Sequence, residues 1–103
     1  MEKLSGFQKK YLRGLAHNLK PVVFIGKNGL AEPVLNSMEE ALNAHEIVKV
    51  KFIDFKEKEK KRTISEELEK ETKSQHVGLI GHVAIFYRMH KDPKKRKIAV
   101  PQK

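Results

Sequence analysis

The fold is decided by Val22-Val23-Phe24-Ile25-Gly26-Lys27-Asn28-Gly29-Leu30. The first four residues are β-branched or aromatic and lie between Pro21 and Gly26, which predicts a short buried strand. After this stretch, apolar residues recur at helical spacing, at Val34, Leu35, Met38, Ala41 and Leu42. The two glycines therefore lie at a turn that connects a strand with an amphipathic helix.

Gly26-Lys27-Asn28-Gly29, called the glycine loop below, has the composition of a phosphate-binding turn. The first N–H groups of a helix lack partners within the helix, and the helix dipole favours anions there. Glycine keeps side chains away from the backbone, and Lys27 adds positive charge. A G-x-x-G loop that clamps a nucleic-acid backbone is typical of KH domains. The alternative is an ordinary tight turn with Asn28 in a left-handed conformation.

The composition fits one domain with one core and a short tail. The 103 residues are 39% hydrophobic. No apolar run approaches the roughly 20 residues that span a membrane, and no signal-peptide core is present. Cysteine is absent, which excludes disulfides and cysteine-ligated zinc. We therefore expect a cytoplasmic protein that does not associate with membranes.

The formal charge of +9 is concentrated at the two ends of the chain. Residues 1–29 and residues 89–103 each carry +5, whereas residues 30–88 carry −1. A basic excess around a neutral body indicates a polyanion-binding face. We expect residues 1–90 to form the domain. Residues 91–103 contain Lys94-Lys95-Arg96-Lys97 and no expected core residues, which predicts a flexible basic tail.

The first predicted helix separates apolar from basic side chains. Ser5 and Gln8 match a capping box at its start. One arc holds the expected core residues Phe7, Tyr11, Leu12, Leu15 and Leu19, and the opposite arc holds Lys9, Lys10, Arg13, His17 and Lys20. A solvated face normally mixes both signs of charge, so this acid-free arc favours binding. Gly14 within the helix indicates close approach of a partner or of the sheet.

Two further segments have opposite patterns. Residues 47–53 alternate as a half-exposed strand, in which Lys49 and Lys51 either extend the basic surface or protect a sheet edge. Residues 56–62 are nearly all charged, which predicts a solvated loop or a frayed helix end. Thr63 and Glu66 then match a second capping box, so a short helix is expected to begin there.

Strands over residues 77–80 and 83–87, separated by Gly81, complete the predicted domain as an antiparallel pair. The resulting order is α-β-α-β-α-β-β. It predicts an α/β domain with a four-stranded mixed sheet packed by three helices.

Motifs along nearly the whole chain resemble those of YhbY-type proteins, the free-standing form of the CRM RNA-binding domain. The matching segments are Lys9-Lys10-Tyr11-Leu12-Arg13-Gly14-Leu15-Ala16-His17, Lys20-Pro21, Ile25-Gly26-Lys27-Asn28-Gly29-Leu30, His45-Glu46-Ile47-Val48-Lys49-Val50, Ile80-Gly81 and Phe86-Tyr87-Arg88. The resemblance implies a fold similar to the C-terminal domain of bacterial translation initiation factor three. It also implies association with precursors of the large ribosomal subunit, and it extends to plant relatives that assist intron splicing.

We therefore expect a monomeric RNA-binding protein that associates with pre-ribosomal RNA of the large subunit and assists ribosome assembly. The expected RNA-binding residues are Lys9, Lys10, Arg13, His17, Lys20, Gly26, Lys27, Asn28, Gly29, Lys49 and Lys51. Most of the seven aromatic residues occupy predicted core positions, so we expect recognition of backbone charge and RNA shape with limited base reading. The alternative is an RNA chaperone, or a splicing or small-RNA cofactor, that is not tied to the ribosome.

Other functional classes fit the sequence less well. The five histidines form no H-E-x-x-H arrangement, and His76 and His82 lack an accompanying carboxylate. No G-x-x-x-x-G-K-[ST] loop or G-x-S-x-G elbow occurs, so we expect no catalytic residues, metal or cofactor, with an RNA-processing enzyme as a remote alternative. A strand follows the first helix, which disfavours a helix-turn-helix DNA-binding module. A membrane-surface helix is disfavoured because the core needs its apolar arc.

Overall fold

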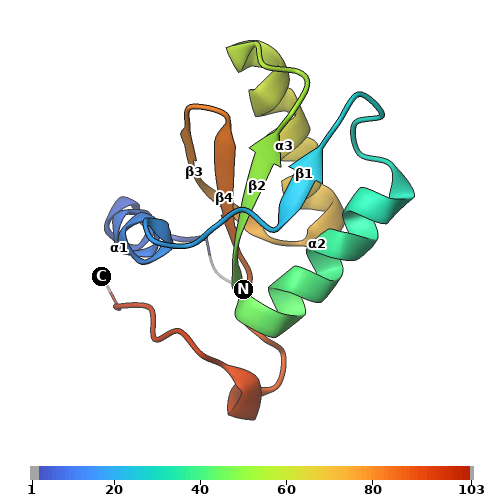
Figure 1. Ribbon diagram of the computed structural model, residues 1–103. Coiled ribbons are helices and arrows are strands. Elements are labelled where there is room, and N and C mark those ends of the chain that lie inside the picture. The colour runs from blue at the N-terminus through green and yellow to red at the C-terminus, as the bar shows by residue number, and fades with distance from the viewer. Residues whose placement is uncertain (1–2, 103) are drawn as a thin grey trace.

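The structure, a computed structural model, describes residues 3–102 (Figure 1). Its elements are α1 (Gly6–Ala16), β1 (Val23–Ile25), α2 (Glu32–His45), β2 (Ile47–Phe52), α3 (Lys58–Thr72), β3 (Gln75–Ile80), β4 (Val83–Tyr87) and a short 3-10 helix, η1 (Pro93–Lys95). The predicted element order and fold class are confirmed. Residues 1–2 of the predicted domain and residue 103 of the predicted tail lie outside the described residues.

The four strands form one mixed sheet in the order β1-β2-β4-β3. β1 pairs with β2 in parallel, whereas the β2–β4 and β3–β4 pairs are antiparallel. Gly81 takes a left-handed φ of 60° in the turn of the predicted β3–β4 hairpin. This topology places β1 at one edge of the sheet, so the glycine loop that follows it lies at the margin of the molecule.

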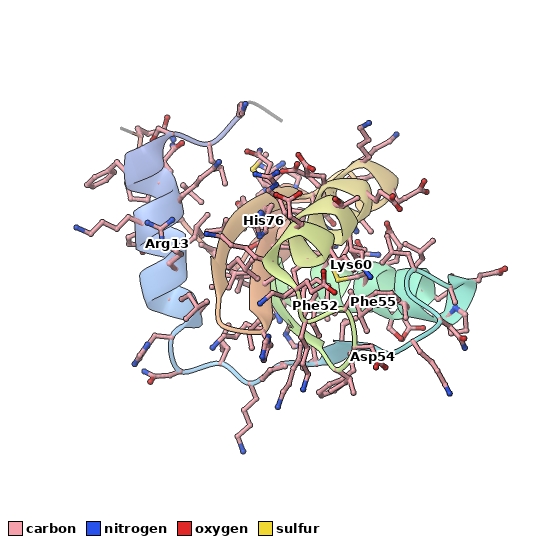
Figure 2. The ribbon with its side chains drawn as sticks, turned by 90° about the horizontal axis from the view of Figure 1, so that it is seen from above. Arg13, Phe52, Asp54, Phe55, Lys60 and His76 are labelled. Carbon is pink, nitrogen blue, oxygen red and sulfur yellow. The ribbon has the colours of Figure 1, made fainter. Side chains whose placement is uncertain are left out.

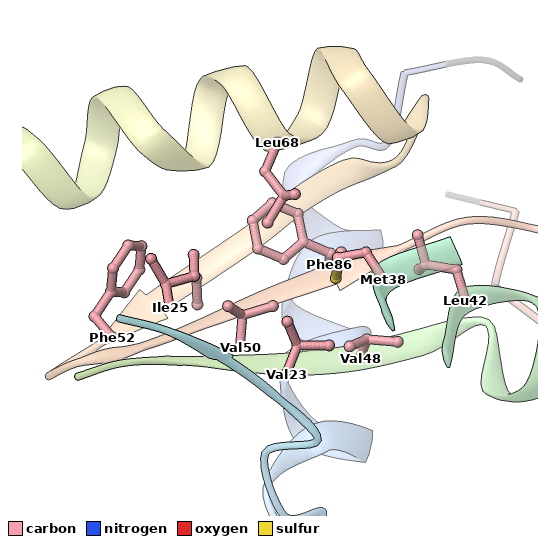
Figure 3. Packing of buried hydrophobic residues seen from close by; sticks show 10 residues of the cluster. Val23, Ile25, Met38, Leu42, Val48, Val50, Phe52, Leu68 and Phe86 are labelled. Atoms are coloured by element: carbon pink, nitrogen blue, oxygen red, sulfur yellow. The ribbon is translucent and has the colours of Figure 1, made fainter. Parts of the chain in front are cut away.

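Two hydrophobic clusters, rather than the single core expected, lie on opposite faces of the sheet. Helices α2 and α3 cover the first, which includes Val23, Ile25, Met38, Leu42, Val48, Val50, Phe52, Leu68 and Phe86 (Figure 3). The second consists of Leu12 and Ala16 from α1 with Ile47, Val77, Ile85 and Tyr87 from the strands. Because a single short helix packs on this second face, part of the sheet stays open there.

Helix α1 begins with the predicted capping box, in which Ser5 and Gln8 accept hydrogen bonds from each other's backbone N–H groups. Its predicted core arc is wrong in four of five members. Leu12 is buried, but the other four side chains are 40–50% exposed: Phe7, Tyr11, Leu15 and Leu19. The buried side chains of α1 that contact the sheet are Leu12 and Ala16, and they lie at the boundary between the apolar and the basic arc. The small Ala16 side chain lets the helix approach the strands closely.

The structure assigns Gly14 no packing role, because no atom lies within 4 Å of the position that its Cβ would take. Alanine is favoured over glycine in a helix, so we expect Gly14→Ala to raise the free energy of unfolding by about 0.5–1 kcal/mol. Urea denaturation measures this change. Gly78→Ala is the matched control and should destabilise, because its Cβ would lie 2.6 Å from Cδ of Arg13. A Gly14→Ala variant less stable than the parent would contradict the prediction.

Helix α3 begins at Lys58, five residues before the predicted start. The predicted capping box at Thr63 is wrong, since the Thr63 hydroxyl donates to the C=O of Glu59 within the helix. Most of the charged segment over residues 56–62 is therefore helical. Within it, Lys61 is buried and its Nζ donates to the C=O of Gly81 at 2.6 Å. This contact ties α3 to the β3–β4 turn.

The segment after β4 lies along the domain and contacts the end of α2. Glu46 is 1% exposed, and its carboxylate accepts hydrogen bonds of 2.7–2.9 Å from the N–H groups of His90, Lys97 and Ile98. Ile98 and Val100 pack against the second cluster. The expectation that the tail has no core residues is therefore wrong. The lysines next to this apolar pair made the segment resemble a solvated tail. The flexibility predicted for the tail is a statement about its motion, which hydrogen exchange of the tail amides can test.

Candidate nucleic-acid interface

The part of the sheet that α1 leaves uncovered is both basic and apolar. Lys49 and Lys51 alternate with buried residues of β2, so they lie on the α1 side of the sheet. The strand register places Phe24 beside Lys51, Lys51 beside Val83, and Val83 beside Ile80. We call Phe24, Lys49, Lys51, Ile80 and Val83 the open sheet face. Phe24 and Ile80 are 52% and 63% exposed, and Lys51 is exposed as well.

The glycine loop follows β1 directly and closes as a four-residue turn. The N–H of Gly29 donates to the C=O of Gly26 at 3.0 Å, and Gly29 takes a left-handed φ of 63°. Asn28 has no positive φ, so the alternative of a left-handed Asn28 is wrong. Lys27 and Asn28 are exposed, and within residues 3–102 their backbone N–H groups donate to no protein acceptor. Two adjacent amides and a lysine thus suit an anion.

The segment after β2 packs against the glycine loop. The N–H groups of Ile53 and Asp54 both donate to the C=O of Ile25, at 2.9 and 3.2 Å. The Phe55 ring lies under Gly29, where an added Cβ would be 3.9 Å from it. Figure 2 shows Asp54 and Phe55 close together at this end of the sheet. The exposed Asp54 places one carboxylate near a loop that is otherwise cationic.

Helix α2 contributes less to this site than the sequence predicts. It begins at Glu32, so Leu30 and Ala31 separate its first turn from the glycine loop. Pro33 has no N–H to offer, and the Glu32 carboxylate already lies at the positive end of the helix dipole. Anion binding at the loop therefore depends on the amides of the turn and on Lys27.

Cations gather at the loop end of the sheet, where His82 occupies the β3–β4 turn. Desolvation lowers the pKa of His82 first, and the cations Lys61, Lys56 and Lys51 lower it further. Nδ1 of His82 lies 3.1 Å from Nζ of Lys61, which suits a neutral imidazole acting as acceptor. The three lysines make the potential at this end of the sheet positive, which favours a polyanion.

Arg13 points from α1 onto β3 and does not extend freely into solvent (Figure 2). Its Nη1 donates to the C=O of Val77 at 3.0 Å, and its aliphatic chain covers Gly78. Arg13 is partly buried, so part of its charge is already engaged by the sheet. It borders the open sheet face, because Gly78 pairs with Ile85 and Ile85 with Lys49.

The other basic residues of α1 lie apart from the glycine loop. Lys9 is partly buried and lines a hollow toward α3, where carboxylates such as Glu66 and Glu69 alternate with the cations Lys58 and Arg62, so its surroundings carry both signs of charge. The exposed basic residues of α1 and of the segment that follows it are Lys10, His17 and Lys20. In Figure 1, α1 lies at the left and the glycine loop at the upper right.

Lys49 and Lys51 connect the two regions across the sheet. Nζ of Lys49 donates to the C=O of Leu19, in the segment that joins α1 to β1, at 2.9 Å. Lys51 lies further along β2, toward the glycine loop. Phe24 is a surface residue that the sequence did not single out. Its place between two buried strand residues, Val23 and Ile25, was the signal that it faces the opposite side of the sheet.

The profile of the CRS1 / YhbY (CRM) domain matches residues 4–88, which include α1, the glycine loop and the open sheet face. The chain belongs to the CRS1 / YhbY (CRM) domain family. The resemblance that its motifs suggested is therefore confirmed. The segment after Arg88, with its contacts to Glu46, lies outside the CRM match.

Relatives of this CRM protein carry names that refer to RNA. A Haemophilus influenzae protein named RNA-binding protein is 45% identical over 103 residues, 100% of both chains. YqeI of Bacillus subtilis, named a probable RNA-binding protein, is 37% identical over 92 residues, 89% of this chain and 95% of YqeI. The solution structure of SAV1595 from Staphylococcus aureus, described as a candidate RNA-binding protein, has a TM-score of 0.81 and 34% identity, covering 96% of this chain and 100% of that one.

Two further properties concern the described part of this CRM protein. Within residues 3–102, no helix combines the length and the apolar character needed to cross a bilayer. The same residues contain no group of three or more histidine, aspartate or glutamate side chains placed to hold a metal ion.

Proposed function

We propose that this CRM domain binds RNA through the glycine loop and the open sheet face. The observation that carries the proposal is the line of cations along one side of the sheet: Lys49 and Lys51 on β2, and Lys27 in a turn whose backbone N–H groups can donate to a phosphate. The names of the relatives support RNA as the polyanion. The exposed basic residues of the α1 region extend this surface away from the loop: Lys10, His17 and Lys20.

In the proposed complex, one phosphate lies against the glycine loop. The amides of Lys27 and Asn28 donate to its oxygens, the Asn28 side chain adds a hydrogen bond, and the Lys27 ammonium supplies charge. Neighbouring phosphates of the same strand lie along Lys51 and Lys49. Such binding releases condensed counterions, so its affinity falls steeply as the salt concentration rises.

We further propose that the RNA is a precursor of large-subunit ribosomal RNA and that the chain acts as a monomeric, cytoplasmic assembly factor. This step rests on the resemblance to YhbY-type proteins. Binding by phosphate contacts is sensitive to salt, which suits a factor that joins an immature particle and then leaves it. In this proposal the basic tail adds affinity for all RNAs alike and does not select among them.

Fractionation of cell extract on a low-salt gradient tests the cellular role. We expect the protein to sediment with immature large-subunit particles, and we expect those particles to accumulate when the protein is absent. Crosslinking in cells should then recover large-subunit precursor RNA. Sedimentation as free protein alone, with unchanged ribosome profiles in its absence, would contradict the proposal and favour an RNA chaperone or a splicing or small-RNA cofactor.

A further inference from the structure

We propose that Phe24 is a stacking site for one unpaired RNA base, next to the phosphate held at the glycine loop. The inference rests on the proposed RNA binding and names the kind of RNA that the site recognises. It departs from the expectation that recognition rests on backbone charge and RNA shape with limited base reading. The RNA must present a base that is free of its helix, as in a loop, a bulge or a single strand.

The first observation is the exposure of the Phe24 ring within a rigid strand. Its neighbours Val23 and Ile25 are 2% and 0% exposed, yet Phe24 is 52% exposed. The two buried neighbours fix the backbone of β1 against the first hydrophobic cluster. The backbone that carries the ring is therefore ordered before a partner arrives, which lowers the entropic cost of binding.

The second observation is the chemistry around the ring. The register puts Lys51 directly beside Phe24 and continues with Val83 and Ile80, so no carboxylate lies in this row. An aromatic face beside a lysine matches a nucleotide, which carries a flat ring and a phosphate. An apolar protein partner would bury the Lys51 charge without compensation, so the row favours RNA.

The third observation is the distance to the glycine loop. Phe24 precedes Gly26 by two residues, which in a strand corresponds to about 7 Å. A base stacked on Phe24 and a phosphate at the glycine loop therefore belong to the same or to adjacent nucleotides. Duplex RNA satisfies the loop but not the ring, because its bases are already stacked on one another.

The test compares a 12-nucleotide single-stranded RNA with the same sequence in a duplex, by fluorescence anisotropy at fixed salt. Phe24→Leu keeps an apolar side chain but removes the aromatic face. We expect it to weaken single-strand binding roughly 5- to 100-fold, in the range found when a stacking aromatic is removed. Its affinity for the duplex should stay within about twofold, and Phe24→Tyr should bind the single strand like the parent.

Phe7→Leu is the matched control, because Phe7 is 50% exposed but lies on α1. We expect it to leave single-strand affinity unchanged. The proposal is overturned if Phe24→Leu binds the single strand as tightly as the parent, if Phe7→Leu loses as much, or if both RNAs are weakened equally. A photo-crosslinking residue at position 24 that labels a ribosomal protein and no RNA would also overturn it. If the parent protein binds neither RNA, the proposed function itself fails, which these variants distinguish from a failure at Phe24 alone.

Discussion

Glu46→Ala is expected to lower the free energy of unfolding by about 2–4 kcal/mol and to release the C-terminal segment. The Glu46 carboxylate is buried and accepts hydrogen bonds from three backbone N–H groups, those of His90, Lys97 and Ile98. Hydrogen bonds to a charged acceptor are stronger than neutral ones, and the substitution leaves all three donors without this partner. Burial and this same carboxylate raise the pKa of Tyr87 nearby.

Urea denaturation measures the loss of stability, and native-state hydrogen exchange locates it. In the parent protein, the amides of Lys97 and Ile98 should be protected, and in Glu46→Ala they should exchange as fast as an unfolded peptide. Asp92→Ala is the control, because its carboxylate accepts only within the tail, from the N–H of Lys94. A loss of stability no larger than that of Asp92→Ala, or fast exchange already in the parent, would show that Glu46 does not anchor this segment.

The elements of the fold were predictable because each depends on local periodicity. The apolar run at residues 22–25, the helical spacing after Leu30 and the alternation over residues 47–53 each specify one element type. Their order then restricts the topology to a mixed sheet. The capping box at Ser5 was predictable for the same reason, since its partners are three residues apart.

The orientation of α1 was not predictable from its own sequence. A helical projection shows that apolar and basic residues separate, but the side that meets the sheet depends on the strands. Here the contact line is Leu12 and Ala16, and Gly78 makes room for the chain of Arg13. The apolar arc therefore stays largely exposed, and a basic residue of the expected binding face packs on β3 instead.

The anchoring of the tail was hidden for a related reason. A glutamate at the end of a helix is usually a solvated residue, and nothing in its neighbours along the chain indicates burial. Glu46 takes a positive φ of 65°, and its partners lie more than 40 residues away. The candidate RNA site shows the same limit. The glycine loop could be predicted from its sequence motif, whereas the cross-strand neighbours of Phe24 depend on the register of the strands, which the sequence does not state.

Replacing Lys27 and Lys51 together by alanine should weaken RNA binding in a way that depends on salt. Each phosphate contact contributes roughly 0.7 to 0.9 to the slope of log affinity against log salt concentration, so the double variant should lose about 1.4 to 1.8 of that slope. Between 50 and 200 mM salt, the parent protein should then lose about 7- to 12-fold more affinity than the variant. Titrations at four or five salt concentrations measure both slopes.

The control is the double replacement of Lys70 and Lys73, which removes the same charge from two exposed positions, one in the last turn of α3 and one directly after it, and α3 covers the opposite face of the sheet from the open sheet face. Both pairs lower the net charge by two, so any general attraction between a basic protein and RNA falls equally in the two variants. Only phosphates in direct contact with a lysine change the number of counterions released. A smaller slope for the Lys27 and Lys51 pair alone therefore locates the RNA on the open sheet face. Equal slopes for the two pairs would mean that RNA contacts the protein without a defined interface, and the proposed site would be wrong.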